Sequence, residues 1–148
     1  MPGFLRALRL LACSFGVKAV VGPSDMLSIK ATLDSGSDDT IVPSQLASKL
    51  GIDLANAPLG ESTAVGGRTF QYPYAEVELR LATNNGDEMF IWNAIVGFSD
   101  ARKTRGILGC AGMMEYFDVA FFGELHEVIL TPNSSFPGKW KLRRSGSE

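Results

Sequence analysis

The sequence predicts an all-β domain that carries one or two short helices. Short β-branched or alternating runs follow one another along most of the chain, and clusters of Gly, Pro, Asn and Asp separate them. Only residues 43–50 and 113–117 are typical of helix. The clearest alternation, from Ala75 to Leu81, puts apolar residues on one face and charged residues on the other, as in a half-buried strand.

The predicted elements of the first half are a hairpin of strands 17–21 and 26–33, a polar loop 34–39, a strand 40–42 and a helix 43–50. Gly22-Pro23-Ser24-Asp25 has the composition of the turn that the hairpin needs. Leu46 and Leu50 stand one helical turn apart, and Gly51 ends the helix.

The predicted elements of the second half are strands 61–65 and 68–74 around a Gly66-Gly67 turn, strand 75–81, strand 88–98, an apolar run 107–109, helix 113–117, and strands 119–122 and 127–130. Two adjacent glycines favour a tight hairpin turn, because both accept positive φ angles. The sequence shows no internal repeat and no linker between residues 17 and 131.

We therefore expect one domain over residues 16–131, with an extension at 1–15 and a flexible tail at 132–148. The extension holds Arg6 and Arg9 among apolar residues, and Arg9 leaves too short an apolar run for a signal peptide. A short amphipathic helix or an unstructured segment is expected there. The tail is rich in Ser, Pro and Gly.

Composition excludes several classes of protein. The chain has 148 residues, 20% of them charged, and a net charge of −2, and its basic residues cluster only in the predicted tail, so no nucleic-acid partner is expected. No apolar run reaches the roughly 18 residues of a membrane span. Two cysteines and one histidine are too few for a disulfide framework or a structural zinc site. A reducing, cytoplasmic location is the default expectation, with a targeting role for residues 1–15 left open.

The segment Leu33-Asp34-Ser35-Gly36-Ser37 carries the chemistry that the sequence offers. It places a carboxylate where a buried strand meets a tight loop; Ser35 can donate a hydrogen bond, and Gly36 lets the backbone approach closely. Two such carboxylates facing each other cannot both ionise, so one acts as general base toward water and the other as general acid toward a carbonyl. The chain has one such loop, so a second copy would supply the other across a two-fold axis. Alone, Asp-Ser-Gly is also a common turn.

The stretch from Ala31 to Val42 closely resembles the active-site loop of the retropepsins: a hydrophobic residue, Asp, Thr or Ser, Gly, then Ala or Ser. Three further features resemble that family in the correct order: Gly66-Gly67 as the flap tip, Ile107-Leu108-Gly109 as the hydrophobic-hydrophobic-Gly element, and 113–117 as its short helix. The resemblance covers about residues 16–131 and is to a non-viral, cellular member. It implies the acid-protease fold, a closed barrel-like structure with one pepsin-like lobe per chain.

The resemblance also implies an activity, an aspartic endopeptidase that hydrolyses peptide bonds of a peptide or protein substrate as a homodimer. It needs no metal or organic cofactor, because carboxylates activate the water. Asp34 would be the catalytic carboxylate, and Ser35, Gly36 and Ser37 would support the active-site loop. Positions that would bind substrate are Asp38, Asp39, Val65, Gly66, Gly67 and Ile107, with Ile41 also lining the pockets. For Asp38 and Asp39, a role in a turn or at a helix start is the alternative.

One departure from the family concerns the residue after Ile107-Leu108-Gly109. Viral enzymes commonly have an Arg there, which pairs with the first acidic residue after the catalytic loop, whereas this chain continues Cys110-Ala111-Gly112. Asp38 therefore lacks that partner, and the viral style of dimer is put in doubt more than the chemistry.

Two other functions remain open from the sequence. A non-catalytic retropepsin-like module could bind peptides or dimerise, although such a module has no need of the Asp34 carboxylate. An unrelated small β-barrel with a chance Asp-Ser-Gly turn is the third possibility. Cleavage of unstructured peptides that depends on Asp34 would separate the peptidase from both.

Overall fold

A computed structural model of the chain describes residues 8–11, 14–21, 25–63, 66–82, 88–101, 105–125 and 127–142. Its strands are β1 (Leu8–Leu11), β2 (Ser14–Val21), β3 (Asp25–Leu33), β4 (Ile41–Pro43), β5 (Leu59–Thr63), β6 (Thr69–Ala82), β7 (Glu88–Ser99), β8 (Arg105–Leu108), β9 (Phe117–Phe122), β10 (Glu127–Pro132) and β11 (Lys139–Leu142). The helices are α1 (Leu46–Lys49) and the 3₁₀ turn η2 (Met114–Tyr116). The predicted all-β class with one or two short helices is confirmed.

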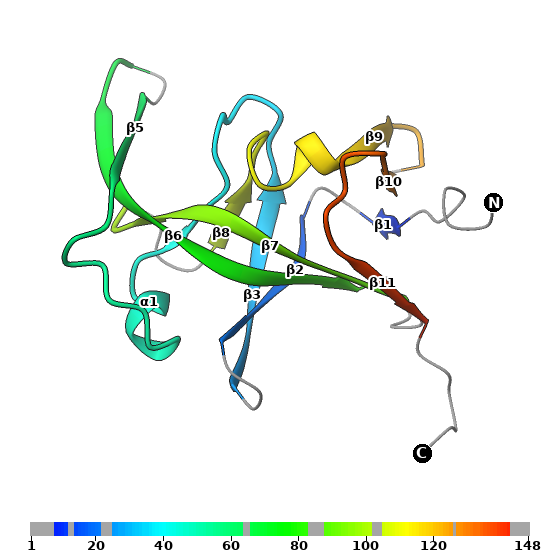
Figure 1. Cartoon of the computed structure of the whole chain (residues 1–148). Coiled ribbons are helices and arrows are strands. Elements are labelled where there is room, and N and C mark those ends of the chain that lie inside the picture. Colours follow the sequence, from blue (N-terminus) through cyan, green and yellow to red (C-terminus); the bar gives the residue numbers. More distant parts are fainter. Residues whose placement is uncertain are drawn as a thin grey trace.

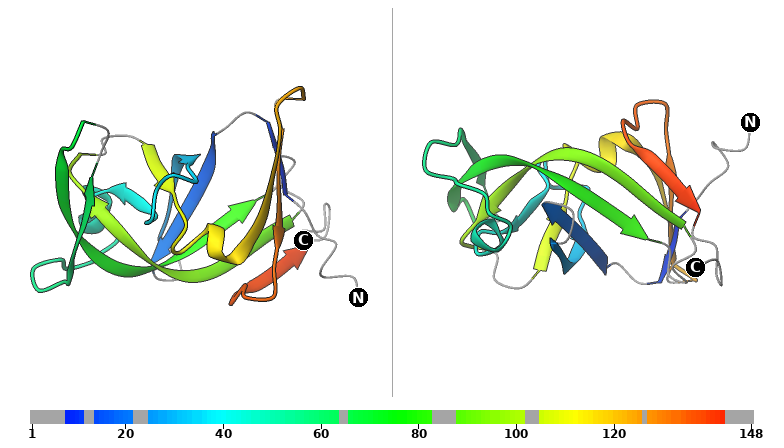
Figure 2. Two further views of the ribbon diagram at one scale, coloured as in Figure 1. Left: turned by 90° about the horizontal axis from the view of Figure 1, so that it is seen from above. Right: turned by 60° about the horizontal axis from the view of Figure 1, so that its bottom comes forward.

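The strands form two sheets (Figure 1). The larger sheet has the order β11-β7-β4-β8-β3-β2-β6-β5, and the smaller has the order β1-β10-β9. An additional pairing joins β6 to β7 over nine residue pairs, from Tyr74↔Gly97 to Ala82↔Met89. Because β6 also pairs with β2, the larger sheet curls into a barrel-like form (Figure 2).

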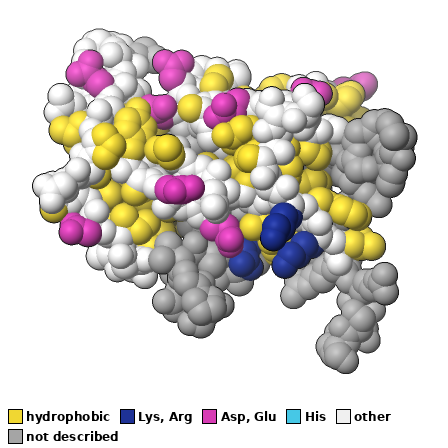
Figure 3. Space-filling view, viewed as in Figure 1, with side chains coloured by type: hydrophobic (Ala, Val, Ile, Leu, Met, Phe, Trp, Pro, Cys, Tyr) yellow, Lys and Arg dark blue, Asp and Glu magenta, His cyan; other side chains and the backbone are white. Residues whose placement is uncertain are grey.

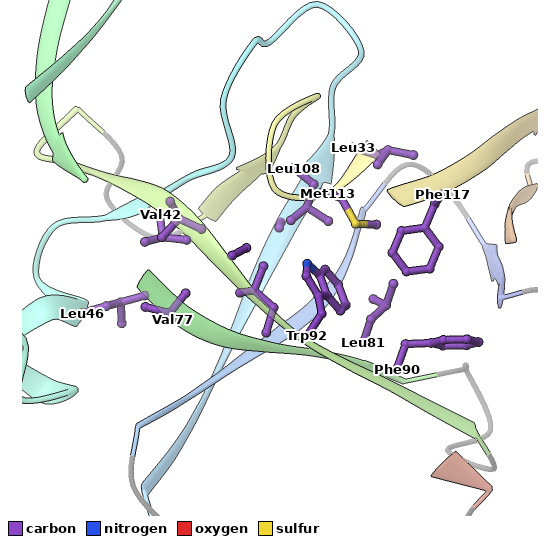
Figure 4. Packing of buried hydrophobic residues seen from close by; sticks show 14 of the residues in the cluster. Leu33, Val42, Leu46, Val77, Leu81, Phe90, Trp92, Leu108, Met113 and Phe117 are labelled. Carbon is purple, nitrogen blue, oxygen red and sulfur yellow. The ribbon is translucent and has the colours of Figure 1, made fainter. Parts of the chain in front are cut away.

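The barrel encloses an apolar core. Leu33 from β3, Leu108 from β8 and Trp92 from β7 belong to one buried cluster, together with residues of β6 and the loop after β8 (Figure 4). Trp92 also donates its indole N–H to the carbonyl of Gly112 at 2.8 Å, which satisfies its one polar atom in a buried place. The core thus lies directly under the end of β3, where Leu33 precedes Asp34.

The local predictions agree well with the structure. The 17–21 and 26–33 runs form the antiparallel hairpin β2–β3, and the strands around Gly66-Gly67 form β5–β6. Both glycines have positive φ, +95° and +83°, as the predicted turn requires. Leu46 begins α1 and Leu50 directly follows it, and both side chains are buried in the core.

The predicted tail is wrong for residues 132–142. Strand β11 pairs with β7 in the register Lys139↔Ile91, and Phe136 packs edge-on or tilted against three aromatic rings, those of Phe90, Trp92 and Phe117. These two contacts bury apolar surface that composition alone did not reveal. Gly138 permits the approach, because a Cβ there would lie 1.8 Å from the carbonyl oxygen of Ile91.

The predicted N-terminal extension also differs from the structure. Residues 8–11 form β1, which pairs with β10 in the register Leu8↔Leu130, and β2 begins at Ser14. Backbone pairing with β10 therefore replaces the expected helix or unstructured segment over these residues. Residues 1–7 and Cys13 lie outside the described residues.

The surface carries exposed apolar side chains as well as charged ones. Large exposed apolar residues include Leu59, Ile95, Phe121, Phe122, Leu125 and Leu142. On the face shown in Figure 3, apolar side chains reach the surface in several places, with polar and acidic side chains between them. Within the described ranges, no helix is long and apolar enough to cross a membrane.

Candidate active site

Asp34 stands where β3 leaves the core. Strand β3 runs parallel to β8 with Leu33 beside Leu108, and the next amide, that of Asp34, donates to the carbonyl of Leu108 at 3.0 Å. Leu33 is buried, whereas the Asp34 side chain is exposed. The parallel pair thus fixes the backbone of Asp34 and leaves its carboxylate accessible.

A tight turn holds the Asp34 carboxylate. The Ser37 amide donates to the Asp34 carbonyl at 3.1 Å, and the Gly36 amide donates to Asp34 Oδ1 at 2.9 Å. A Cβ on Gly36 would lie 3.2 Å from that same oxygen, which is a tight contact. Glycine at this position therefore lets a backbone N–H lie close to the carboxylate and donate to it.

The rest of the Asp34 loop, defined as residues 34–40, is joined to the chain after β8. The amides of Cys110 and Ala111 donate to the carbonyls of Ser37 and Asp38 at 2.9 and 2.8 Å. Gly109 lies so close that a Cβ there would be 2.1 Å from the carbonyl oxygen of Asp39. The glycine of Ile107-Leu108-Gly109 thus allows two segments of backbone to lie side by side.

Thr40 completes this junction from inside. Its side chain is fully buried; its hydroxyl donates to the Ala111 carbonyl at 2.8 Å and accepts from the Gly109 amide at 3.2 Å. Its own carbonyl accepts from the Gly97 amide at 2.9 Å. Thr40 thereby joins the loop to β7 and to the segment that follows β8.

A cavity of about 530 Å³ lies over Asp34. Its lining comprises Asp34, Gly36, Ser37, Ile41, Ser62, Thr63, Phe70, Tyr72, Ser99, Ala101 and Ile107. The Asp34 loop contributes one side, and the β5–β6 hairpin contributes another through Ser62, Phe70 and Tyr72. An exposed carboxylate on one side of a partly apolar cavity has the composition of a small-molecule or peptide site.

The β5–β6 hairpin extends away from the barrel at the end opposite to the chain termini (Figure 1). We call this segment, residues 59–74, the flap hairpin. Its Gly66 and Gly67 have nothing within 4 Å of an ideal Cβ, so the turn has open space around it.

Two tyrosines of β6 connect the flap hairpin to the Asp34 loop. The hydroxyls of Tyr72 and Tyr74 both donate to Asp39 Oδ2, each at 2.6 Å. Their rings pack edge to face, with centroids 5.5 Å apart. Burial, with the neighbouring Asp39 carboxylate as the next cause, raises the pKa of both phenols, so each hydroxyl keeps the proton that it donates.

The structure brings five of the eleven predicted site residues together at one cavity. Asp34, Gly36, Ser37, Ile41 and Ile107 line the cavity. Ser35 is exposed beside them, and its carbonyl accepts a long hydrogen bond from Cys110 Sγ at 3.8 Å.

The acidic pair and the flap tip fall elsewhere. Asp38 is exposed and Asp39 turns its carboxylate to the two tyrosines; neither is among the cavity-lining residues. Gly66 and Gly67 lie at the flap tip, also outside the lining, and Val65 lies outside the described residues.

Sequence reasoning missed part of the cavity wall. Phe70 and Tyr72 line it from β6, Ser99 lines it from the end of β7, and Ala101 lines it from the turn that follows. Phe70, Tyr72 and Tyr74 alternate along one face of a strand, which was a usable signal. Nothing local, however, says that this face turns toward Asp34.

The chain was compared with known families, curated proteins and solved structures. The family described as aspartyl protease matches residues 17–111. Among solved structures, the chain is similar to a retropepsin-like aspartic protease from Rickettsia conorii, at 19% sequence identity and a TM-score of 0.50, over 85% of this chain and 99% of that chain. This likeness confirms the expected acid-protease fold. None of the curated proteins compared matches the chain.

Proposed function

Because the chain belongs to the aspartyl protease family, we propose that it is an aspartic endopeptidase that works as a homodimer, with Asp34 of each copy forming the catalytic pair. The observation that carries the proposal is the presentation of Asp34. Its carboxylate is exposed, oriented by the Gly36 amide, and lies beside a 530 Å³ cavity that the flap hairpin borders. Family membership makes peptides the substrate class.

The second copy is needed because the sequence holds a single Asp-Ser-Gly motif. An exposed Asp34 can approach its symmetry mate, and two carboxylates at close range share one proton. The reaction thus needs one ionised and one protonated carboxyl group, and a two-fold dimer supplies both from identical residues.

Hydrolysis then proceeds by proton transfer without a covalent intermediate on the protein. The ionised Asp34 takes a proton from water, whose oxygen attacks the carbonyl carbon, while Asp34 of the second copy gives its proton to the carbonyl oxygen. Asp34, now protonated, then gives its proton to the amide nitrogen, while Asp34 of the second copy takes a proton from a hydroxyl of the tetrahedral diol; the C–N bond breaks, and an acid and an amine are released. Ser62, Phe70 and Tyr72 of the flap hairpin and Ile107 of β8 border the space for the peptide.

The experiment that tests this function compares Asp34→Asn with Asp53→Asn. Asp53 is exposed in the segment after α1, where its Oδ1 accepts from the Ala55 amide, an interaction that Asn retains. Both proteins are assayed for cleavage of unstructured peptides at acidic pH, with mass determined by light scattering. We expect Asp34→Asn to abolish cleavage with the dimer unchanged, and Asp53→Asn to cleave like the unmodified protein.

Concentration dependence gives a second readout of the same proposal. Activity per chain should rise with chain concentration and level off where the dimer is complete. Cleavage by a monomer at every concentration, or cleavage that survives in Asp34→Asn, would rule out the shared site. Peptide binding without cleavage would identify the non-catalytic module instead.

A further inference from the structure

We propose that Asp39 is a positioning residue, whose carboxylate holds the flap hairpin over the Asp34 loop through Tyr72 and Tyr74 and does not contact the peptide substrate. Its meaning for catalysis rests on the proposed peptidase function, whereas the attachment can be measured without any activity. The observation is that two phenols of one strand converge on a single carboxylate oxygen of the loop.

The two hydrogen bonds are of the strong kind. Each O–H···O separation is 2.6 Å, within the range of hydrogen bonds to an ionised acceptor. The donors lie 33 and 35 residues after Asp39 in the sequence, so the contact joins two separate parts of the fold. Asp39 itself is half-buried, which weakens competition from water.

The neighbouring strands leave room for this arrangement. A Cβ on Gly97 of β7 would lie 2.3 Å from the Tyr72 ring, and a Cβ on Gly60 of β5 would lie 2.1 Å from the Tyr74 hydroxyl. In the strand register, Gly97 lies opposite Tyr74, and Gly60 lies opposite Tyr72. Each ring therefore crosses diagonally over the glycine opposite the other tyrosine: Tyr72 over Gly97 and Tyr74 over Gly60. Side chains at either position would push a phenol away from Asp39.

The attachment joins two sides of the candidate site. The Asp39 backbone belongs to the Asp34 loop, where its carbonyl accepts from the Ser37 hydroxyl at 2.7 Å and its strand bridge is to Ala111. Tyr72 lines the cavity over Asp34, whereas Asp39 is not part of that lining. The Asp39 carboxylate therefore fixes the position of Tyr72 relative to the Asp34 loop without itself lining the cavity.

Amide hydrogen exchange on the full-length chain without peptide tests the attachment directly. We expect Asp39→Ala to speed exchange in residues 59–63 and 69–74 by about tenfold, the order expected when hydrogen bonds to a charged group are lost, and to leave β7 protected. Tyr72→Phe/Tyr74→Phe should speed the same amides to a similar extent, and the triple variant should add nothing further. Glu76→Gln, which removes an exposed carboxylate from the same strand, should leave exchange unchanged.

Peptide cleavage by the same variants separates positioning from substrate contact. If Asp39 acts through the tyrosines, Asp39→Ala and the double Phe variant lower kcat/KM by similar factors, and the triple variant is no worse than either. If Asp39 touches substrate, the two factors multiply in the triple variant, which overturns the proposal. Unchanged exchange in the flap hairpin of Asp39→Ala overturns it as well.

Should Asp39→Ala not fold, Asp39→Asn retains the shape and one acceptor oxygen, and flap hairpin exchange intermediate between Asp39→Ala and the unmodified chain is expected. Exchange as slow as that of the unmodified chain together with an unchanged kcat/KM would count against the charge-assisted attachment. Should the unmodified protein cleave no peptide, the proposed function fails, and the exchange measurements still decide whether Asp39 holds the hairpin.

Discussion

At Thr40, one hydroxyl serves two buried backbone groups at once. It donates to the Ala111 carbonyl and accepts from the Gly109 amide, and the side chain is fully buried. Thr40→Val keeps the shape but leaves both groups without that partner. We expect the free energy of unfolding to fall by about 1–3 kcal/mol, measured by denaturant titration.

Thr40→Ser is the matched control, because it keeps the hydroxyl and loses one methyl group, worth roughly 1 kcal/mol. We expect Thr40→Ser to be more stable than Thr40→Val, whereas the hydrophobicity of the two side chains alone would give the opposite order. A Thr40→Val protein as stable as the unmodified chain would show that the hydroxyl is not what joins the loop to residues 109–111.

At the scale of elements, the tyrosine side chains of β6 need glycine at the neighbouring positions of β5 and β7. Gly97→Ala would put a Cβ 2.3 Å from the ring of Tyr72, which is 1% exposed and cannot move outward. We expect this overpacking to cost about 1–3 kcal/mol of unfolding free energy. Gly60→Ala should cost less, since the half-buried Tyr74 can turn away.

Gly123→Ala is the control for both, because nothing lies within 4 Å of a Cβ at that turn. Its unfolding free energy should stay within about 0.5 kcal/mol of the unmodified value, as for ordinary surface substitutions. Equal effects of all three substitutions would mean that the contacts with the phenols are not what limits these positions.

The elements that local signals define were predictable, and those that distant contacts define were not. Gly66-Gly67 specifies its turn by backbone preference, and the alternation from Ala75 to Leu81 specifies its buried face. Strand β11 was missed, because its surroundings are rich in Ser, Pro and Gly and Phe136 gains its burial from rings 19 to 46 residues earlier.

The candidate site divides in the same way. The Asp34 loop was readable from a contiguous motif, together with Ile107, because sequence order and spacing carry that information. The partners of Asp39 were not readable. A carboxylate and two phenols more than 30 residues apart have no local pattern that joins them.

At the scale of the whole molecule, the tyrosines make the free energy of unfolding fall as the pH becomes alkaline. The sequence has three tyrosines, and burial raises the pKa of Tyr72, Tyr74 and Tyr116 above the ordinary value of 10.0. A raised pKa in the folded state means that the native protein holds these protons more tightly than the unfolded chain. The stabilisation is complete below pH 10 and is lost as the pH rises beyond it.

We therefore expect phenolate absorbance to appear at a higher pH than in the unfolded chain, and to appear together with unfolding. Absorbance at about 295 nm and circular dichroism are followed from pH 8 to pH 12, with the chain in concentrated denaturant as the reference that titrates near 10. In Tyr72→Phe/Tyr74→Phe, the fall in stability above pH 10 should be smaller. Full ionisation near pH 10 in a chain that is still folded would contradict the assignment.

The junction between the Asp34 loop and residues 108–111 has a consequence for the timing of synthesis. The loop takes hydrogen bonds from partners 69 to 75 residues later, at Gly109 and Cys110. At about 5–20 residues per second, a ribosome needs roughly 4–15 s to add that length after Asp34. A nascent chain therefore lacks an ordered Asp34 loop until most of it has been made, so any activity that depends on this loop begins only after the N-terminal strands have been synthesised.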